Sequence, residues 1–173
     1  MRKVKYIVAS SLDNFIARED GSVDWLIMEG EHMQEFAEYS RAFDTVLMGR
    51  KTYEWGVSQG MTAYPGMQNY VFSRTLQESP DTRVTIIAKN ASEFIGELKH
   101  KNGRDIMLMG GGELAASLLF ENLIDEIILN VHPVLLGSGI PLFTEVNSQI
   151  DLELIDHRIY KNGLIMPFYR VKK

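Results

Sequence analysis

The 173-residue sequence contains no cysteine. This absence excludes disulfides, thiolate metal ligands, iron–sulfur clusters and a cysteine nucleophile. The histidines lack metal-ligand spacing, so we predict no metal site. No Gly-x-Ser-x-Gly motif is present, and a serine hydrolase therefore has no local support. The four histidines are His32, His100, His132 and His157.

The sequence also has few basic residues and no long apolar run. It carries 18 Lys and Arg against 23 Asp and Glu, a net charge of −5, which argues against a nucleic-acid binder or a basic membrane-surface protein. Its longest apolar stretches, such as residues 114–120, are far shorter than the roughly 20 residues of a membrane-spanning helix. The basic residues 1–5 lead into a strand rather than a signal peptide. We expect a cytoplasmic protein with a small-molecule substrate.

Short β-rich runs alternate with helical patterns, and no repeat, low-complexity tract or linker interrupts them. This organisation predicts a single α/β domain over residues 1–173, with a mostly parallel sheet and four helices. A fourth helix should begin after Gly49. Strands are predicted at 4–11, 45–48, 70–73, 84–88, 105–109, 126–131, 152–160 and 164–171, and the other helices at 31–43, 92–101 and 113–122.

The C-terminal end has a different pattern. Asn162 and Gly163 lie between two β runs and predict a type I′ turn, in which both central residues have positive φ. The last two strands should therefore pair as an antiparallel hairpin. Pro167 cannot donate to a strand ladder, so we expect it at a bulge or a sheet edge.

Three strand ends carry residues suited to anions. After strand 45–48, Gly49 is followed by Arg50, Lys51 and Thr52 at the start of an apparent helix, where free N–H groups and cations favour phosphate. A capped helix with solvated cations is the structural alternative. A Walker loop is excluded because its glycine and Gly-Lys positions are occupied by Asp44 and Gly49-Arg50.

The second strand end carries three glycines, Gly110, Gly111 and Gly112. Without Cβ atoms they let a pyrophosphate approach the backbone, which is the interpretation we favour; a tight turn with positive φ is the structural alternative. The pattern differs from the Rossmann fingerprint, since Leu114 and Ala115 follow.

The third strand end carries Ser73 and Arg74, which suit a phosphomonoester because arginine binds phosphate bidentately. A polar strand terminus is the alternative. Ligands of open α/β sheets gather outside the carboxyl ends of the strands, which favours joint use of the three positions.

Two further segments border this predicted groove. The long polar loop after residue 11 contains one apolar pair, Ile16 and Ala17, and is typical of a lid, or else of a surface loop anchored by Trp25. Segment 133–143 is a Gly/Pro-built turn for which we expect a structural role. Several methionines are expected to fill gaps in the core. These are Met28, Met33, Met48, Met107 and Met109.

The order of these motifs resembles the dihydrofolate reductase superfamily from about residue 4 to the C-terminus. The matching segments are Val8-Ala9, Ile16-Ala17, Trp25, 48–54, 72–74 and 106–112. Segment 133–143 is similar to the C-terminal reductase domain of the bifunctional riboflavin-biosynthesis deaminase–reductase, of which this chain would be a stand-alone relative without the zinc deaminase half. The resemblance implies a three-layer α/β/α fold with an eight-stranded mixed sheet and an antiparallel C-terminal hairpin.

The resemblance also implies NADPH as the cofactor and a homodimer as the assembly. The phosphates would contact Gly49, Arg50, Lys51 and Thr52, and the 2′-phosphate would contact Ser73 and Arg74. Gly110, Gly111 and Gly112 would lie against the pyrophosphate and the nicotinamide side. Ala9, Ile16 and Ala17 would hold the nicotinamide.

Dihydrofolate reductases place a carboxylate on the helix after the tryptophan, where it stabilises positive charge or supplies a proton at the reduced C=N bond. Glu31 and Glu35 lie one turn apart on that predicted helix, so either is a candidate catalytic acid, with a solvated acidic face as the alternative. We therefore expect a reductase similar to 5-amino-6-(5-phosphoribosylamino)uracil reductase. Dihydrofolate reduction and a non-catalytic NADPH-binding module are the alternatives.

Overall fold

The computed structural model describes residues 1–144 and 146–173. Its main sheet has eight strands in the order β5-β4-β3-β6-β1-β7-β10-β9. The six strands from β5 to β7 run parallel to one another. Strand β10 runs antiparallel to both of its neighbours, β7 and β9. The strands are β1 (Val4–Ser11), β3 (Phe43–Gly49), β4 (Gln68–Phe72), β5 (Val84–Ile87), β6 (Asp105–Met109), β7 (Glu126–His132), β9 (Leu152–Ile159) and β10 (Ile165–Val171).

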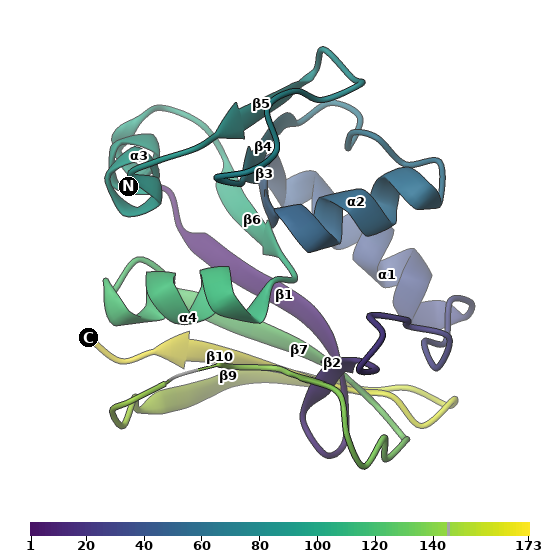
Figure 1. The fold of residues 1–173 in the computed structure, drawn as a ribbon. Helices are drawn as coiled ribbons and strands as arrows, with labels where there is room; N and C mark the ends of the chain where they lie inside the picture. Colours follow the sequence, from purple (N-terminus) through teal and green to yellow (C-terminus); the bar gives the residue numbers. More distant parts are fainter. Residues whose placement is uncertain (145) are drawn as a thin grey trace.

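Helices cover both faces of this sheet (Figure 1). Helices α3 (Ala91–His100) and α4 (Gly112–Phe120) pack on one face, and α1 (Glu31–Tyr39) and α2 (Arg50–Ser58) pack on the other. Side chains of β1 alternate between the two cores because successive residues of a strand point to opposite faces. The structure thus confirms the predicted α/β/α arrangement with a mixed, mostly parallel sheet.

The end of α1 differs from the prediction. The helix ends at Tyr39, a 3-10 turn follows at Ser40–Ala42, and Phe43 already belongs to β3. Phe43 is 1% exposed, and its ring meets the Tyr39 ring edge-on at 5.3 Å between centroids. Packing against the sheet therefore overrides the helical periodicity that placed residue 43 in the helix.

The predicted C-terminal hairpin forms, but the type I′ turn is wrong. Gly163 has positive φ, whereas Asn162 does not. Gly163 N–H donates to the Tyr160 carbonyl at 3.0 Å, and Tyr160 N–H donates to the Leu164 carbonyl at 2.9 Å. This is a three-residue loop in which only the last residue needs the left-handed region. Pro167 lies in the interior strand β10, one residue before a bulge between Phe168 and Tyr169.

A small second sheet, which the sequence did not predict, orders the loop after β1. Strand β2 (Phe15–Ala17) pairs with β8 (Ile140–Pro141). The Asp13 carboxylate accepts the backbone N–H groups of Leu136 at 3.1 Å and Gly137 at 2.8 Å. The expected lid is therefore joined to segment 133–143, which has the structural role that we expected of it.

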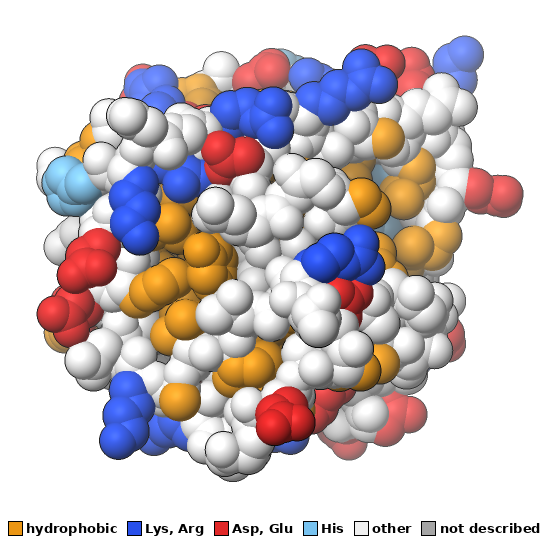
Figure 2. Space-filling model, turned by 90° about the horizontal axis from the view of Figure 1, so that it is seen from above, with side chains coloured by type: hydrophobic (Ala, Val, Ile, Leu, Met, Phe, Trp, Pro, Cys, Tyr) orange, Lys and Arg blue, Asp and Glu red, His pale blue; other side chains and the backbone are white. Residues whose placement is uncertain are grey.

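The surface carries charges of both signs. On the face in Figure 2, Lys and Arg side chains are interspersed with Asp and Glu, and hydrophobic side chains show in two areas, left of the centre and at the upper right. In the part of the chain that the structure describes, no helix is long and apolar enough to span a membrane.

Candidate active site

One cavity of about 1420 Å³ runs along the carboxyl ends of the parallel strands. It extends from the turn after β5, past the ends of β4, β3 and β6, to the ends of β1 and β7. Ordinary ligand pockets occupy roughly 300–1,000 Å³, so this cavity has room for a large ligand and a second molecule.

The cavity brings together all the residues that we predicted as cofactor contacts. They come from four separate strand ends and from the loop after β1, so that only the fold makes them neighbours. They are Ala9, Ile16, Ala17, Gly49, Arg50, Lys51, Thr52, Ser73, Arg74, Gly110, Gly111 and Gly112.

Three helices begin at the cavity, and none of them has a side-chain cap. The N-cap residues are Gly49 for α2, Asn90 for α3 and Gly111 for α4. The first N–H groups of a helix lack partners within the helix and carry partial positive charge. Such groups bind phosphate when no side chain caps them. The backbone alone thus presents N–H groups to the cavity at three helix starts.

The glycines after β6 allow these helix starts to approach each other. Gly110 and Gly111 have φ of +57° and +78°, a region that residues with a Cβ rarely adopt. A Cβ on Gly112 would lie 3.0 Å from the carbonyl oxygens of Pro141 and Leu142. The triple glycine therefore meets both backbone and packing requirements, and its predicted contact with a cofactor is compatible with them.

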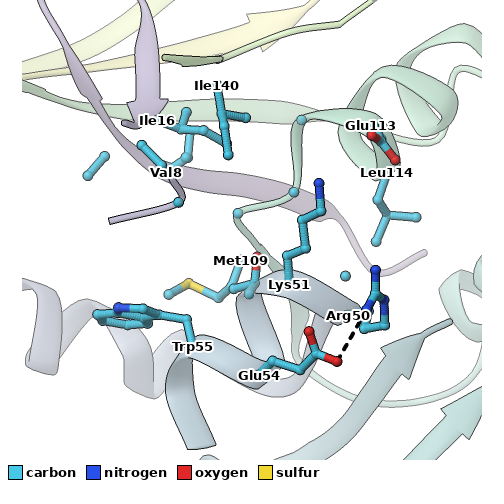
Figure 3. A pocket seen from close by; sticks show the side chains of 18 of the residues that line it. Val8, Ile16, Arg50, Lys51, Glu54, Trp55, Met109, Glu113, Leu114 and Ile140 are labelled. Carbon is cyan, nitrogen blue, oxygen red and sulfur yellow. Dashed lines mark hydrogen bonds and ion pairs between the residues drawn. The ribbon is translucent and has the colours of Figure 1, made fainter. Parts of the chain in front are cut away.

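Cations stand beside the helix starts. Figure 3 shows Lys51 extending from α2 across the cavity toward α4, and Arg50 lying near Leu114. Arg50 Nη1 is 3.4 Å from Glu54 Oε1 in an exposed ion pair. Arg74 is exposed and makes no ion pair among the described residues. Arg74 is thus available to a ligand without breaking an internal contact.

Ser73 is buried at the end of β4. Its Oγ accepts the backbone N–H of Leu76 at 2.9 Å and that of Thr75 at 3.2 Å. This turn holds the neighbouring Arg74 at the cavity wall. The Ser73 hydroxyl can still donate its own proton to a ligand, because its contact with Thr75 Oγ1 is long at 3.4 Å.

The other end of the cavity is enclosed by apolar side chains. Figure 3 shows Ile16 and Ile140 side by side next to Val8, and Met109 next to Trp55. Ile16 and Ile140 belong to the two strands of the small sheet, so pairing of those strands positions this part of the wall. We did not predict the role of Trp55 or Ile140, because nothing local in the sequence marks them.

Two further groups of lining residues were missed or misassigned. Lys89 and Asn90 follow β5 and line the cavity; the strand-then-helix rule used for the other anion positions would have found them. Met28 and Met33 line the cavity and belong to neither core cluster, so their prediction as core fillers was wrong. Met109 also lines the cavity, but it packs against the core as expected. Met48 and Met107 are buried in the core as expected.

Neither candidate catalytic carboxylate lines the cavity. Glu31 is exposed. Glu35 pairs with Arg158 and accepts the Tyr160 hydroxyl at 2.8 Å. The Tyr160 hydroxyl and then the Arg158 guanidinium hold the pKa of Glu35 below its ordinary value. The two glutamates miss the cavity because α1 turns His32 and Phe36 toward the sheet.

The polar groups at the apolar end come from β7. Asn130 pairs in register with Ala9 of β1, and both Asn130 and His132 line the cavity. His132 is 2% exposed, and the Trp25 ring meets its ring edge-on at 5.2 Å. Burial lowers the pKa of His132, and the nearby His32 adds to this, while the Asn130 carbonyl opposes it. The imidazole is therefore neutral at pH 7.

Within residues 1–144 and 146–173, no three His, Asp or Glu side chains are grouped to hold a metal ion.

The strand order and the cavity at the strand ends together define a dihydrofolate reductase-like α/β protein. The chain belongs to the RibD C-terminal domain family, whose family model matches residues 2–166. This places it among reductase domains of the riboflavin-pathway type.

Three known proteins show the range of the similarity. The "Uncharacterized protein YwjB" of Bacillus subtilis (strain 168) is 41% identical over 171 residues, covering 98% of each chain. The crystal structure of a "Putative riboflavin biosynthesis protein" from Shewanella sp. PV-4 is 28% identical, with a TM-score of 0.85 over 99% of both chains.

The third is the diaminohydroxyphosphoribosylaminopyrimidine deaminase/5-amino-6-(5-phosphoribosylamino)uracil reductase of Thermotoga maritima. It is 15% identical, with a TM-score of 0.72, and the match covers 99% of this chain but 57% of that one. At this identity the similarity supports the fold alone.

Proposed function

We propose that this protein is an NADPH-dependent reductase that transfers a hydride to the carbon of a C=N or C=O group in a small heterocyclic or sugar-derived substrate. The observation that carries the proposal is the single cavity in which Gly49–Thr52, Ser73-Arg74 and Gly110–Gly112 meet. Three uncapped helix starts and four cations suit a ligand with a pyrophosphate and a further phosphate. A cytoplasmic location is part of this proposal.

When bound, NADPH supplies the hydride, and the protein supplies position and electrostatics. Arg50 and Lys51 would hold the pyrophosphate with the N–H groups of α2. Arg74 and Ser73 would hold the 2′-phosphate, which NADH lacks. Ile16 and Ala17 would cover the nicotinamide and exclude water from the reacting carbon.

The reaction type resembles that in the description of the Thermotoga maritima protein, 5-amino-6-(5-phosphoribosylamino)uracil reductase. Dihydrofolate reduction has less support, because neither Glu31 nor Glu35 reaches the cavity. A non-catalytic NADPH-binding module would bind the cofactor without oxidising it in the presence of any acceptor.

Titration with NADPH tests the proposal. Trp55 lines the cavity, so its fluorescence should change as the cofactor binds, and the Trp55→Phe variant identifies its share of the signal. Saturation at micromolar NADPH is expected. No binding below about 1 mM, where the binding free energy is only about −4 kcal/mol, would contradict the proposed function.

We also propose a homodimer. β9 is an edge strand of the main sheet, and several apolar side chains on it and on β10 are exposed. A second copy of the chain would cover them and remove an unpaired edge. They are Leu152, Leu154, Ile155, Ile159 and Ile165.

A further inference from the structure

The charged residues that line the cavity are unevenly distributed. Arg50 and Lys51 follow β3, Arg74 follows β4, and Lys89 follows β5. Within the described residues these four are all the cations of the lining. Their three strands are neighbours at one edge of the sheet. The cations are therefore confined to the end that we assign to the phosphates of NADPH.

The opposite end lies over β1, β7 and β10 and beneath α1, and we call it the substrate end. Its wall includes Ile7, Ile27, Phe36 and Ile128. It contains no cation among the described residues, while Glu19 and Asp20 contribute carboxylates from the loop after β2. A hydrogen bond from Ser22 lowers the pKa of Asp20, so this carboxylate is ionised at neutral pH.

Two cations near this end, Arg18 and Arg158, are paired with carboxylates. Arg18 Nε lies 2.6 Å from Asp24 Oδ1. Arg158 pairs with Glu35 outside the cavity. An anion placed at the substrate end would therefore lose hydration and gain no positive partner, which is unfavourable.

Methionine is over-represented in the lining, although isoleucine contributes one side chain more. Five of the nine methionines line the cavity. Thioether side chains are flexible and polarisable, and they pack well against aromatic rings of different shapes. Trp55 adds an aromatic surface beside Met109 (Figure 3). The five are Met28, Met33, Met61, Met109 and Met166.

Two polar side chains of β7, Asn130 and His132, line this end. His132 Nδ1 is 3.0 Å from the Asn130 carbonyl. His132 Nε2 and Asn130 Oδ1 are buried and have no partner within the described residues. Neither atom has exposed surface, so neither offers an anion a hydrogen bond.

We propose that the substrate is an uncharged, planar conjugated compound that carries a C=N or C=O group and has neither phosphate nor carboxylate. This inference rests on the reductase function proposed above. In the reaction the carbon of the double bond gains the hydride, the attached nitrogen or oxygen gains a proton from water, and NADPH becomes NADP⁺. The substrate thus differs from a phosphoribosyl compound in lacking an anionic group.

A matched pair of probes tests this assignment. Methyl 4-formylbenzoate and 4-formylbenzoate share a ring and an aldehyde, and they differ in that only the second is an anion. Binding is followed by NMR of ¹³C-methyl-labelled methionine, with and without NADP⁺. We expect the ester to bind at least about tenfold tighter and to shift the methyl signals of the five cavity methionines. Met1, Met48, Met67 and Met107, which do not line the cavity, should not shift.

The variant Met28→Arg places a cation at the substrate end. Met28 is 58% exposed, so the substitution is compatible with folding, and it should shift the preference toward the carboxylate by at least about tenfold. Leu135→Arg, at a site that is 68% exposed and outside the cavity, should leave the preference unchanged.

Three outcomes would overturn the inference: carboxylate binding as tight as that of the ester, shifts at the four other methionines, or no shift with either probe. These outcomes are distinct from failure of the proposed function. Loss of NADPH binding would refute the reductase, whereas the preference between the two probes is measured without cofactor as well.

Discussion

A methyl group on the α-carbon of Gly110 would lie 2.8 Å from Thr52 Oγ1. The turn that ends β6 therefore rests directly on the first turn of α2. Gly111 continues this contact, since a Cβ there would be 3.8 Å from the Gly49 nitrogen. Two of the predicted anion-binding positions, which Thr52 and Gly110 join across 58 residues of sequence, share one packed junction.

Gly110→Ala should disturb both positions together. The left-handed φ costs alanine about 1 kcal/mol, and displacement of Thr52 adds to that. We expect lower stability in urea and weaker NADPH binding. Gly96→Ala in α3 is the control, because a Cβ there meets nothing within 4 Å. NADPH affinity equal to wild type in Gly110→Ala would argue against a cofactor at this junction.

Arg74→Ala should weaken NADPH far more than NADH. A charge-assisted contact with the 2′-phosphate contributes roughly 1.5–3 kcal/mol, and NADH has no such group. Dissociation constants for the two cofactors measure the difference. Arg83→Ala removes an exposed arginine that pairs with Asp81 outside the cavity, and it should leave both constants unchanged. An equal loss for both cofactors would refute the role of Arg74.

Glu35→Gln should affect stability and not catalysis. The pKa of Glu35 is lower in the folded chain than in the unfolded chain. Its carboxylate therefore stabilises the fold at pH values above the unfolded pKa, and this stabilisation is lost as the pH falls through the folded pKa. Thermal unfolding should show a small deficit at pH 7, up to about 1 kcal/mol for a partly exposed pair, which disappears in acid. Unchanged stability with abolished NADPH oxidation would instead restore Glu35 as a catalytic acid.

His132 should make stability depend on pH near neutrality. Burial holds its folded pKa below the ordinary value of 6.5. Above pH 6.5 the His132 side chain is neutral in both the folded and the unfolded chain. Between pH 6.5 and the lower folded pKa, only the unfolded chain binds a proton at this residue, so the free energy of unfolding falls as the pH falls through this range. Denaturation from pH 8 to 5 should show this slope, and His132→Gln should reduce it. His157→Gln, at an exposed residue of β9, should retain it.

Ile159→Glu tests the proposed homodimer. Ile159 is 72% exposed on β9, so the monomer tolerates the change, whereas two like charges at a two-fold interface repel. Sedimentation should show a dimer for the wild type and a monomer for the variant. Leu12→Glu, 62% exposed on the turn after β1, should stay dimeric. A monomeric wild type would exclude the assembly.

The regular elements could be predicted because their signals are local. Strand β6 was predicted with its observed bounds, Asp105–Met109, since an apolar run stops there at glycine. The candidate anion-binding residues have a local signal too, because each group directly follows a strand. The structure then shows that these separate segments border one cavity.

The remaining features depend on contacts that no local pattern carries. Strands β2 and β8 have three and two residues, too few for an alternation of side chains to be recognised. The rotation of α1 is set by His32, whose Nε2 lies 2.9 Å from the Ile27 carbonyl and whose ring packs on Tyr160. A sequence cannot show which face of an acidic helix will turn inward.

The pairing of β2 with β8 has a consequence for ligand entry. At Gly139, a Cβ would lie 2.2 Å from the Ala17 carbonyl, so the two segments are in direct backbone contact and leave no space between them. A wall fixed in this way is ordered before any ligand arrives, and association then requires little loss of chain entropy there. Amide protons of residues 15–17 should accordingly exchange slowly in the free protein, unlike those of a swinging flap.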